Sequence, residues 1–396
     1  ECEKIKGSKN LNVPHLRFTE FSGEWKEELL DRIATLSKGI GIPKEQLSED
    51  GDPCILYGEL YTKYKSEIIK QVESKTDIDG SKLKRSKAND VIIPCSGETA
   101  VDIATARCVP FDSILLGGDL NVISLHKYDG AFMSYQLNGK RKYDIARVAQ
   151  GVSVVHLYGE HLKTIKTYNP TLPEQQKIAI LLSLLDERIA TQNKIIEDLK
   201  KLKCAIIEKL YSKIQGKEYS YGQLFDVVNE RNKQMEYYNI LSASQEKGMV
   251  NRDDLNLDIQ FERSNINTYK IVRKGDYVIH LRSFQGGFAF SDKLGVCSPA
   301  YTILRPNSLL EYSYLSYYFT SQRFIKSLII VTYGIRDGRS INVEEWLNMK
   351  VVIPSKEHQL HTLNVLKRID DKVENEEKYA TCLSNQKQYL LRQMFI

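Results

Sequence analysis

The sequence contains no long apolar run. Its longest largely apolar stretch, from Ile178 to Leu185, is far shorter than the roughly 20 residues that a membrane-spanning helix requires, so no transmembrane helix is predicted. The first residues, Glu1-Cys2-Glu3-Lys4, contain no apolar core, and we expect no secretory signal. The seven cysteines include no Cys-x-x-Cys pair, and their odd number and scatter indicate reduced thiols in a cytoplasmic protein.

Motifs for nucleotide and metal chemistry are also missing. No Gly-x-x-x-x-Gly-Lys-Ser/Thr loop is present, which excludes ATP binding by that route. Asn169-Pro170-Thr171 breaks the Asn/Asp-Pro-Pro-Tyr/Phe signature of adenine methyltransferases. The histidine pairs, His156 with His161 and His358 with His361, have no neighbouring residues of metal-ligand spacing. We therefore assign no catalytic residue and no metal ligand, and we expect this chain to bind no cofactor.

The composition is that of an ordinary globular protein. The 396 residues are 42% hydrophobic and 27% charged, and the length suggests two to three domains. The net charge of +5 is compatible with nucleic-acid binding but does not demonstrate it. There are 23 tyrosines against 2 tryptophans, and tyrosine is a residue of recognition surfaces as well as of cores.

The sequence contains an internal repeat with an offset of 184 residues, visible first as two heptad seams. The seam in each copy has seven apolar positions interrupted by two polar ones, and Asp186 and Asp370 occupy matching places beside it. The first copy comprises Leu182, Leu185, Ile189, Gln192, Ile196, Leu199, Lys203, Ile206 and Leu210. The second comprises Leu366, Ile369, Val373, Glu376, Ala380, Leu383, Lys387, Leu390 and Met394.

The segments before the two seams also match, with separations between 180 and 195 residues. Phe132-Met133-Ser134-Tyr135, for example, resembles Tyr314-Leu315-Ser316-Tyr317. Short β-branched runs such as 91–93 and 120–124 predict strands, and the segments 25–35 and 314–324 predict helices. The pattern predicts an α+β fold with two similar mixed α/β domains, each followed by a long helix. The predicted boundaries are 1–24 for an N-terminal segment, 25–172 and 217–354 for the domains, and 173–216 and 355–396 for the helices.

Each apolar seam requires a partner, and the matching seam in the other copy can supply it. We therefore predict that the two helices pack as an antiparallel coiled coil and that the molecule has an internal pseudo-twofold duplication. The first seam is roughly 40 Å long at about 1.5 Å per residue. Half-sites one turn of B-DNA apart are separated by roughly 34–36 Å, so such a spacer could hold two reading domains on one duplex. A coiled coil in a scaffold without DNA is the alternative.

Several segments of the chain carry a resemblance to a known family. They are Val13–Phe18, Phe21–Trp25, Cys54–Thr62, Ser96–Ala100, Ala149–Tyr158, Leu172–Ala179 and Arg336–Ser340. These segments resemble the specificity subunit of type I restriction–modification systems. The resemblance extends over nearly the whole chain after the first dozen residues, and the order of the domains matches. The second helix departs from the family pattern, because Glu357-His358-Gln359 stands where Glu-Gln-Gln is usual.

The resemblance implies two target-recognition domains that each read one half of a bipartite, asymmetric site in double-stranded DNA. It implies a chain without catalytic activity that docks two modification subunits and the translocating restriction subunits, and no membrane. S-adenosylmethionine for adenine methylation, and ATP and magnesium for restriction, would be bound by those partners. The alternative is a two-domain coiled-coil interaction scaffold that does not read DNA.

Candidate DNA contacts in the first domain begin with the basic stretch 63–87, which has eight Lys or Arg residues against four acidic ones. Such a stretch is typical of a phosphate-facing surface, although a solvated loop would look the same. Polar residues elsewhere in the domain are weaker candidates. The predicted contacts are Lys63, Lys82, Lys84, Arg85, Ser96, Glu98, Thr99 and Gln150.

In the second domain, Arg and Gln side chains follow a predicted strand ending at His280, and these residue types pair with guanine and adenine in the major groove. The predicted contacts are Ser244, Gln245, Arg282, Ser283, Gln285, Arg336 and Arg339. If Arg282 reads a base, Arg282→Ala should relax specificity at one position of the second half-site. Sequencing of methylated genomic DNA checks this, and an unchanged methylation motif would exclude the assignment.

Overall fold

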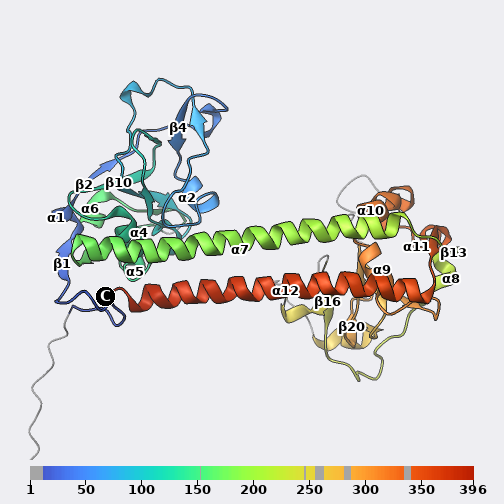
Figure 1. Ribbon diagram of the computed structural model, residues 1–396. Helices are drawn as coiled ribbons and strands as arrows, with labels where there is room; N and C mark the ends of the chain where they lie inside the picture. The colour runs from blue at the N-terminus through green and yellow to red at the C-terminus, as the bar shows by residue number, and fades with distance from the viewer. Residues whose placement is uncertain (1–11, 152, 245–246, 255–262, 281–286, 334–339) are drawn as a thin grey trace, which may run out of the picture. The chain divides into compact units, whose positions relative to one another are not determined.

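The structure is a computed structural model that describes residues 12–396 except 152, 245–246, 255–262, 281–286 and 334–339. The chain divides into two compact units, residues 1–193 with 378–396 and residues 194–377. Each unit contains one α/β domain and a part of each of the two long helices, α7 (Leu172–Ser212) and α12 (Lys356–Gln393) (Figure 1). Within the described residues, no helix is long and apolar enough to cross a membrane.

The first domain is built on an antiparallel sheet with the strand order β2-β10-β6-β8. The strands are β2 (Ala34–Lys38), β10 (Leu120–Leu125), β6 (Asp90–Pro94) and β8 (Arg107–Val109). Side chains alternate between the two faces of a strand. In β6, Val91 and Ile93 therefore join one apolar cluster and Ile92 joins another, so both faces of the sheet are covered.

Smaller elements extend this domain. Strand β1 (Lys26–Leu29) pairs with β12 (Lys166–Asn169), directly before α7. Helix α4 (Gly130–Asn138) packs against β6 and β8. A second sheet of four short strands has the order β3-β5-β4-β9, formed by β3 (Leu47–Ser48), β5 (Lys75–Thr76), β4 (Asp52–Ile55) and β9 (Leu115–Leu116).

The second domain repeats the main sheet of the first. Its order is β14-β21-β18-β19, formed by β14 (Phe225–Val228), β21 (Thr302–Pro306), β18 (Tyr277–Ile279) and β19 (Phe288–Phe290). Strand β13 (Lys217–Ser220) pairs with β24 (Lys350–Ile353) as β1 pairs with β12. The core of the second domain is aromatic, and Tyr221 stacks on Trp346 with 4.2 Å between the ring centroids. The predicted α+β class and the duplication are confirmed.

The predicted seams lie between α7 and α12, and all of their residues are buried or half-buried. The helices run antiparallel in each unit. The start of α7 lies beside the end of α12 in the first unit, and the end of α7 lies beside the start of α12 in the second. Matching polar contacts fix this arrangement. Lys387 lies 2.6 Å from Asp186 in the first unit, and in the second unit Lys203 forms an ion pair with Asp370.

One of the two polar positions in each seam, Lys203 in the first and Lys387 in the second, thus has the same structural role in both copies. Each aspartate also accepts a hydrogen bond from a tyrosine of its own domain, Tyr135 to Asp186 at 2.7 Å and Tyr317 to Asp370 at 2.6 Å. Each lysine ammonium lies over the ring of that same tyrosine, at 5.7 Å for Lys387 and 5.2 Å for Lys203. We call each set of tyrosine, aspartate and lysine a latch. The latch joins a domain to both helices.

The predicted helix over 25–35 is wrong. Residues Lys26–Leu29 and Ala34–Lys38 are strands, and only Leu30–Ile33 forms a helical turn, α1. The strands pair with β12 and β10, so tertiary pairing overrides the apolar spacing that suggested a helix.

The predicted helix over 314–324 is two helices, α9 (Tyr314–Tyr318) and α10 (Gln322–Ser327). The break occurs because the Ser321 side chain accepts a hydrogen bond from the Phe324 N–H and so caps α10. Helix α7 ends at Ser212, four residues before Gly216, and the chain continues into β13.

Candidate nucleic-acid interface

Two of the basic residues predicted to face phosphates form internal contacts. Lys63 lies 2.8 Å from the Glu59 carboxylate, and this hydrogen bond raises the lysine pKa. Arg85 lies 2.6 Å from Asp52 and donates to the Ser113 carbonyl oxygen at 3.0 Å. Both side chains are still about two-fifths exposed. Lys82 is exposed at the end of a single 3-10 turn, and Lys84 is half-buried beside it. The phosphate role of the stretch stays a prediction.

The weaker first-domain candidates come together around a two-residue ladder. Strand β7 (Ser96–Gly97) pairs with β11 (Val155–His156), and His156 exchanges backbone hydrogen bonds with Gln150 at 2.7 and 2.9 Å. Ser96 and Gln150, 54 positions apart in sequence, therefore flank the same residue. Thr99 caps helix α3 (Ala100–Ile103), where its hydroxyl accepts from the Asp102 N–H and donates to the Asp102 carboxylate. Its role is therefore local.

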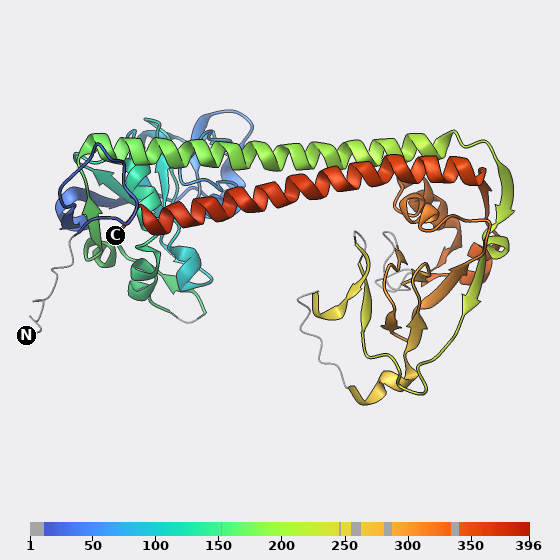
Figure 2. The ribbon, with the colours of Figure 1, turned by 60° about the horizontal axis from the view of Figure 1, so that its bottom comes forward.

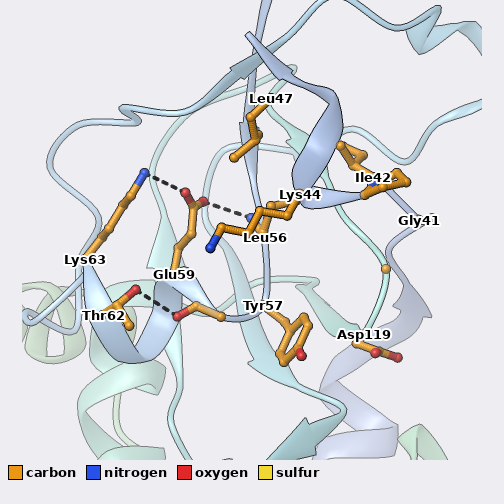
Figure 3. A pocket seen from close by; sticks show the side chains of 13 residues that line it. Gly41, Ile42, Lys44, Leu47, Leu56, Tyr57, Glu59, Thr62, Lys63 and Asp119 are labelled. Carbon is orange, nitrogen blue, oxygen red and sulfur yellow. Dashed lines mark hydrogen bonds and ion pairs between the residues drawn. The ribbon is translucent and has the colours of Figure 1, made fainter. Parts of the chain in front are cut away.

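Two hollows open on the surface of the first domain, one on each side of the segment Tyr57–Thr62. This segment, which we call the ridge, contains the short helix α2 (Glu59–Thr62). The first hollow has a volume of about 710 Å³ and is lined by Gly41, Ile42, Pro43, Lys44, Leu47, Leu56, Tyr57, Gly58, Glu59, Thr62, Lys63, Gly118 and Asp119 (Figure 3). The second is about 690 Å³ and is lined by Tyr57, Gly58, Leu60, Tyr61, Thr62, Ser96, Gly97, Glu98, Asp102, Thr105, Arg107, Ser153 and Val154.

Further exposed aromatic and basic groups lie on the same domain. Tyr158 stacks on His156 at 6.2 Å and meets His161 edge-on at 5.5 Å. The Lys38 ammonium lies 5.6 Å from the Tyr158 ring, and the Gln150 amide nitrogen is 3.4 Å from His161. Sequence reasoning missed Tyr57, Lys44 and Tyr158 as candidates. The high tyrosine count was the available signal, but composition does not say which tyrosines are exposed.

In the second domain only Ser244 of the predicted contacts lies within the described residues. It ends strand β15 (Leu241–Ser244), which pairs with β16 (Gly248–Asn251), and its hydroxyl accepts from the Lys247 N–H at 3.3 Å. Ser244 therefore closes a turn. The other predicted contacts lie outside the described residues; these are Gln245, Arg282, Ser283, Gln285, Arg336 and Arg339.

The part of the chain that the structure describes contains no candidate metal site. No three His, Cys, Asp or Glu side chains lie there in an arrangement that could hold a metal ion. The hollows of the first domain are lined by aromatic, backbone and charged groups instead. Such groups can contact bases and phosphates.

Comparisons with known proteins agree with this architecture. Residues 23–201 match the family model of the type I restriction modification DNA specificity domain. The MjaVIII type I restriction enzyme specificity subunit of Methanocaldococcus jannaschii is 25% identical over 324 residues, which are 73% of this chain and 74% of that protein. The type I S subunit of M. genitalium has a similar fold, with 17% identity, a TM-score of 0.57, and coverage of 97% of this chain and 99% of that one.

A further solved structure, of a chain from a study of complex assembly and conformational transition in the type I restriction–modification system, has a TM-score of 0.60 at 14% identity. It covers 94% of this chain and 97% of its own. The duplicated domains and paired long helices give this chain a fold similar to that of the type I S subunit of M. genitalium. Residues 23–201 match the type I restriction modification DNA specificity domain, which indicates a DNA specificity role for this part of the chain.

Proposed function

We propose that this chain reads a bipartite, asymmetric site in double-stranded DNA for a type I restriction–modification complex, with one half-site for each domain. The duplicated main sheet carries the proposal, because two similar domains with different surface loops can read two different half-sites. The interaction scaffold without DNA reading is not favoured, since residues 23–201 match a DNA specificity domain.

In this proposal the chain has no catalytic activity and binds no cofactor. Two modification subunits would supply S-adenosylmethionine and methylate adenine, and they would extract the target base from the duplex. Restriction subunits would supply ATP-dependent translocation and cleavage, with magnesium. The complex would act on DNA in the cytoplasm.

The test compares the methylation motif of a strain that carries this chain with that of a strain from which it is deleted. We expect a two-part methylation motif that disappears on deletion. In a gel-shift assay, the chain with its modification subunits should bind a duplex bearing that motif far more tightly than random duplexes. The salt concentration must be the same for both, because it determines the affinity for non-specific DNA. Persistence of the motif after deletion, or equal binding of both duplexes, would contradict the proposal.

A further inference from the structure

The ridge Tyr57–Thr62 stands between the two hollows of the first domain. We propose that it is a base-reading element, and that the Glu98 carboxylate beside it accepts a hydrogen bond from the exocyclic amino group of a cytosine or adenine. This inference rests on the proposed function and adds the residues and the base chemistry of the first half-site.

The start of the ridge is fixed by Glu59. Its carboxylate is buried, accepts from the Leu56 N–H at 2.9 Å and pairs with Lys63 at 2.8 Å. The Ser74 hydroxyl also donates to it. Figure 3 shows the contacts of Glu59 with Lys63 and with Leu56 at the first hollow. A carboxylate held by three donors makes a poor ligand for DNA but a firm support for the backbone of the ridge.

The other end of the ridge is fixed by Arg107. This buried guanidinium donates to the Tyr64 carbonyl oxygen at 2.9 Å and to the Leu60 carbonyl oxygen at 3.4 Å. Burial lowers its pKa. Because the last carbonyls of a helix have no partner within the helix, the bond to Leu60 stabilises the end of α2, and the bond to Tyr64 holds the residues that follow it. The ridge is therefore preorganised, which reduces the entropy lost on binding.

The ridge nevertheless presents two aromatic rings to solvent. Tyr57 is 39% exposed and Tyr61 is 37% exposed. The Tyr61 hydroxyl donates to the Ser96 carbonyl oxygen at 3.1 Å, so this ring is held against strand β7. Tyr57 lines both hollows. Exposed tyrosines on a rigid support are typical of recognition surfaces, because they offer a large contact area with few torsions to immobilise.

The two hollows present different charged side chains. The first contains the exposed Lys44 and the exposed Asp119 as well as the paired Glu59 and Lys63 (Figure 3). On the second side, the Asp102 carboxylate is engaged by Thr99, whereas Glu98 is exposed and has no hydrogen bond or ion pair with the described residues. A carboxylate repels phosphate but accepts from cytosine N4 and other base amino groups. The Lys44 ammonium therefore suits a phosphate, and the Glu98 carboxylate suits a base edge.

The experiment uses the full chain assembled with its modification subunits, and the readout is the methylation motif together with binding to motif and random duplexes. Glu98→Gln is expected to relax or change one position in one half of the motif and to leave the other half intact. Tyr57→Ala should lower discrimination at that same half by about tenfold or more. Lys44→Ala should weaken binding to all duplexes. It should also reduce the slope of log affinity against log salt concentration by about one.

Tyr143→Ala is the matched control, because Tyr143 is 65% exposed on α5 (Lys142–Val148) and lines neither hollow. It should leave the motif unchanged. Full discrimination in both Glu98→Gln and Tyr57→Ala would overturn the inference, and so would equal damage to both halves of the motif in complexes of wild-type melting temperature. In either case, dependence of the wild-type motif on this chain would still support the proposed function.

Discussion

Replacing Lys387 with methionine is expected to lower the free energy of unfolding of the first unit by about 3–5 kcal/mol, the usual cost of removing one partner from a buried ion pair. The Lys387 side chain is only 13% exposed and lies 2.6 Å from both Glu67 and Asp186, which are also buried. Methionine preserves the apolar stem but leaves two carboxylates without their cation. Chemical denaturation measures the effect.

The chain offers a matched control, the second latch. In Lys203→Met the partner Asp370 keeps 37% of its side-chain exposure, so water can replace the lysine, and no second carboxylate corresponding to Glu67 pairs with Lys203 among the described residues. We expect a loss of about 1 kcal/mol or less. Each unit contains one buried tryptophan, Trp25 in the first and Trp346 in the second, so single-tryptophan variants can separate the two transitions. Equal losses in the two variants would contradict the burial argument.

The loss in the free energy of unfolding caused by Lys387→Met should also depend on pH. Burial raises the pKa of Glu67, while Lys387 opposes that rise. A carboxyl whose folded pKa is raised contributes stability at low pH that is lost as the pH rises through that pKa. Removing Lys387 raises the pKa of Glu67 further, so the loss of stability should be larger at high pH and should shrink on acidification, as the carboxyl becomes protonated. A deficit that grew on acidification would show that the lost charge pair is not its cause.

The helical part of the fold could be predicted from sequence because a heptad seam is a local, periodic signal. Even the polar exceptions were visible, since Lys203 and Lys387 occupy equivalent places. Their partners required the structure, because the latch joins residues such as Tyr135 and Asp186 that lie 51 positions apart. The aspartates and tyrosines had each been matched between the two copies, but nothing local connects one set to the other.

The start of each long helix shows how a sequence comparison can miss a conserved arrangement. Glu357-His358-Gln359 departs from the family pattern, yet Gln359 performs the role of Gln175. Gln175 accepts from the Asp129 N–H at 2.9 Å and donates to the Pro170 carbonyl oxygen, whereas Gln359 accepts from the Glu311 N–H at 2.7 Å and donates to the Pro354 carbonyl oxygen. One glutamine at each start is sufficient for these contacts.

The candidate site was less accessible to sequence reasoning, because charge and residue type do not indicate which side chains are already paired. Arg85 and Lys63 stood out as basic residues, but each has an acidic partner within its own domain. The ridge gave no comparable signal. Its exposure depends on Glu59 and Arg107, and Arg107 lies more than 40 positions from the residues that it supports.

The second large effect is expected from lengthening both long helices by four residues. Asp186 and Lys203 are 17 positions apart on α7, and Asp370 and Lys387 are 17 positions apart on α12. A paired insertion within both intervals keeps these spacings equal, so both latches can still form. Four helical residues add about 6 Å, and one base pair occupies about 3.4 Å. The complex should therefore lose its original methylation motif and gain one whose gap is longer by one to two base pairs, with both half-sites unchanged.

An insertion of four residues into α7 alone is the informative control. The spacing on α7 becomes 21 while that on α12 remains 17, so one ion pair must break if the other is kept. We expect this variant to unfold at a lower temperature than the paired insertion and to methylate both the old and the new motif poorly. Sequencing of methylated DNA and thermal unfolding of the assembled complex measure the two effects. An unchanged gap in the stable paired variant would exclude the helices as the element that sets the distance between half-sites.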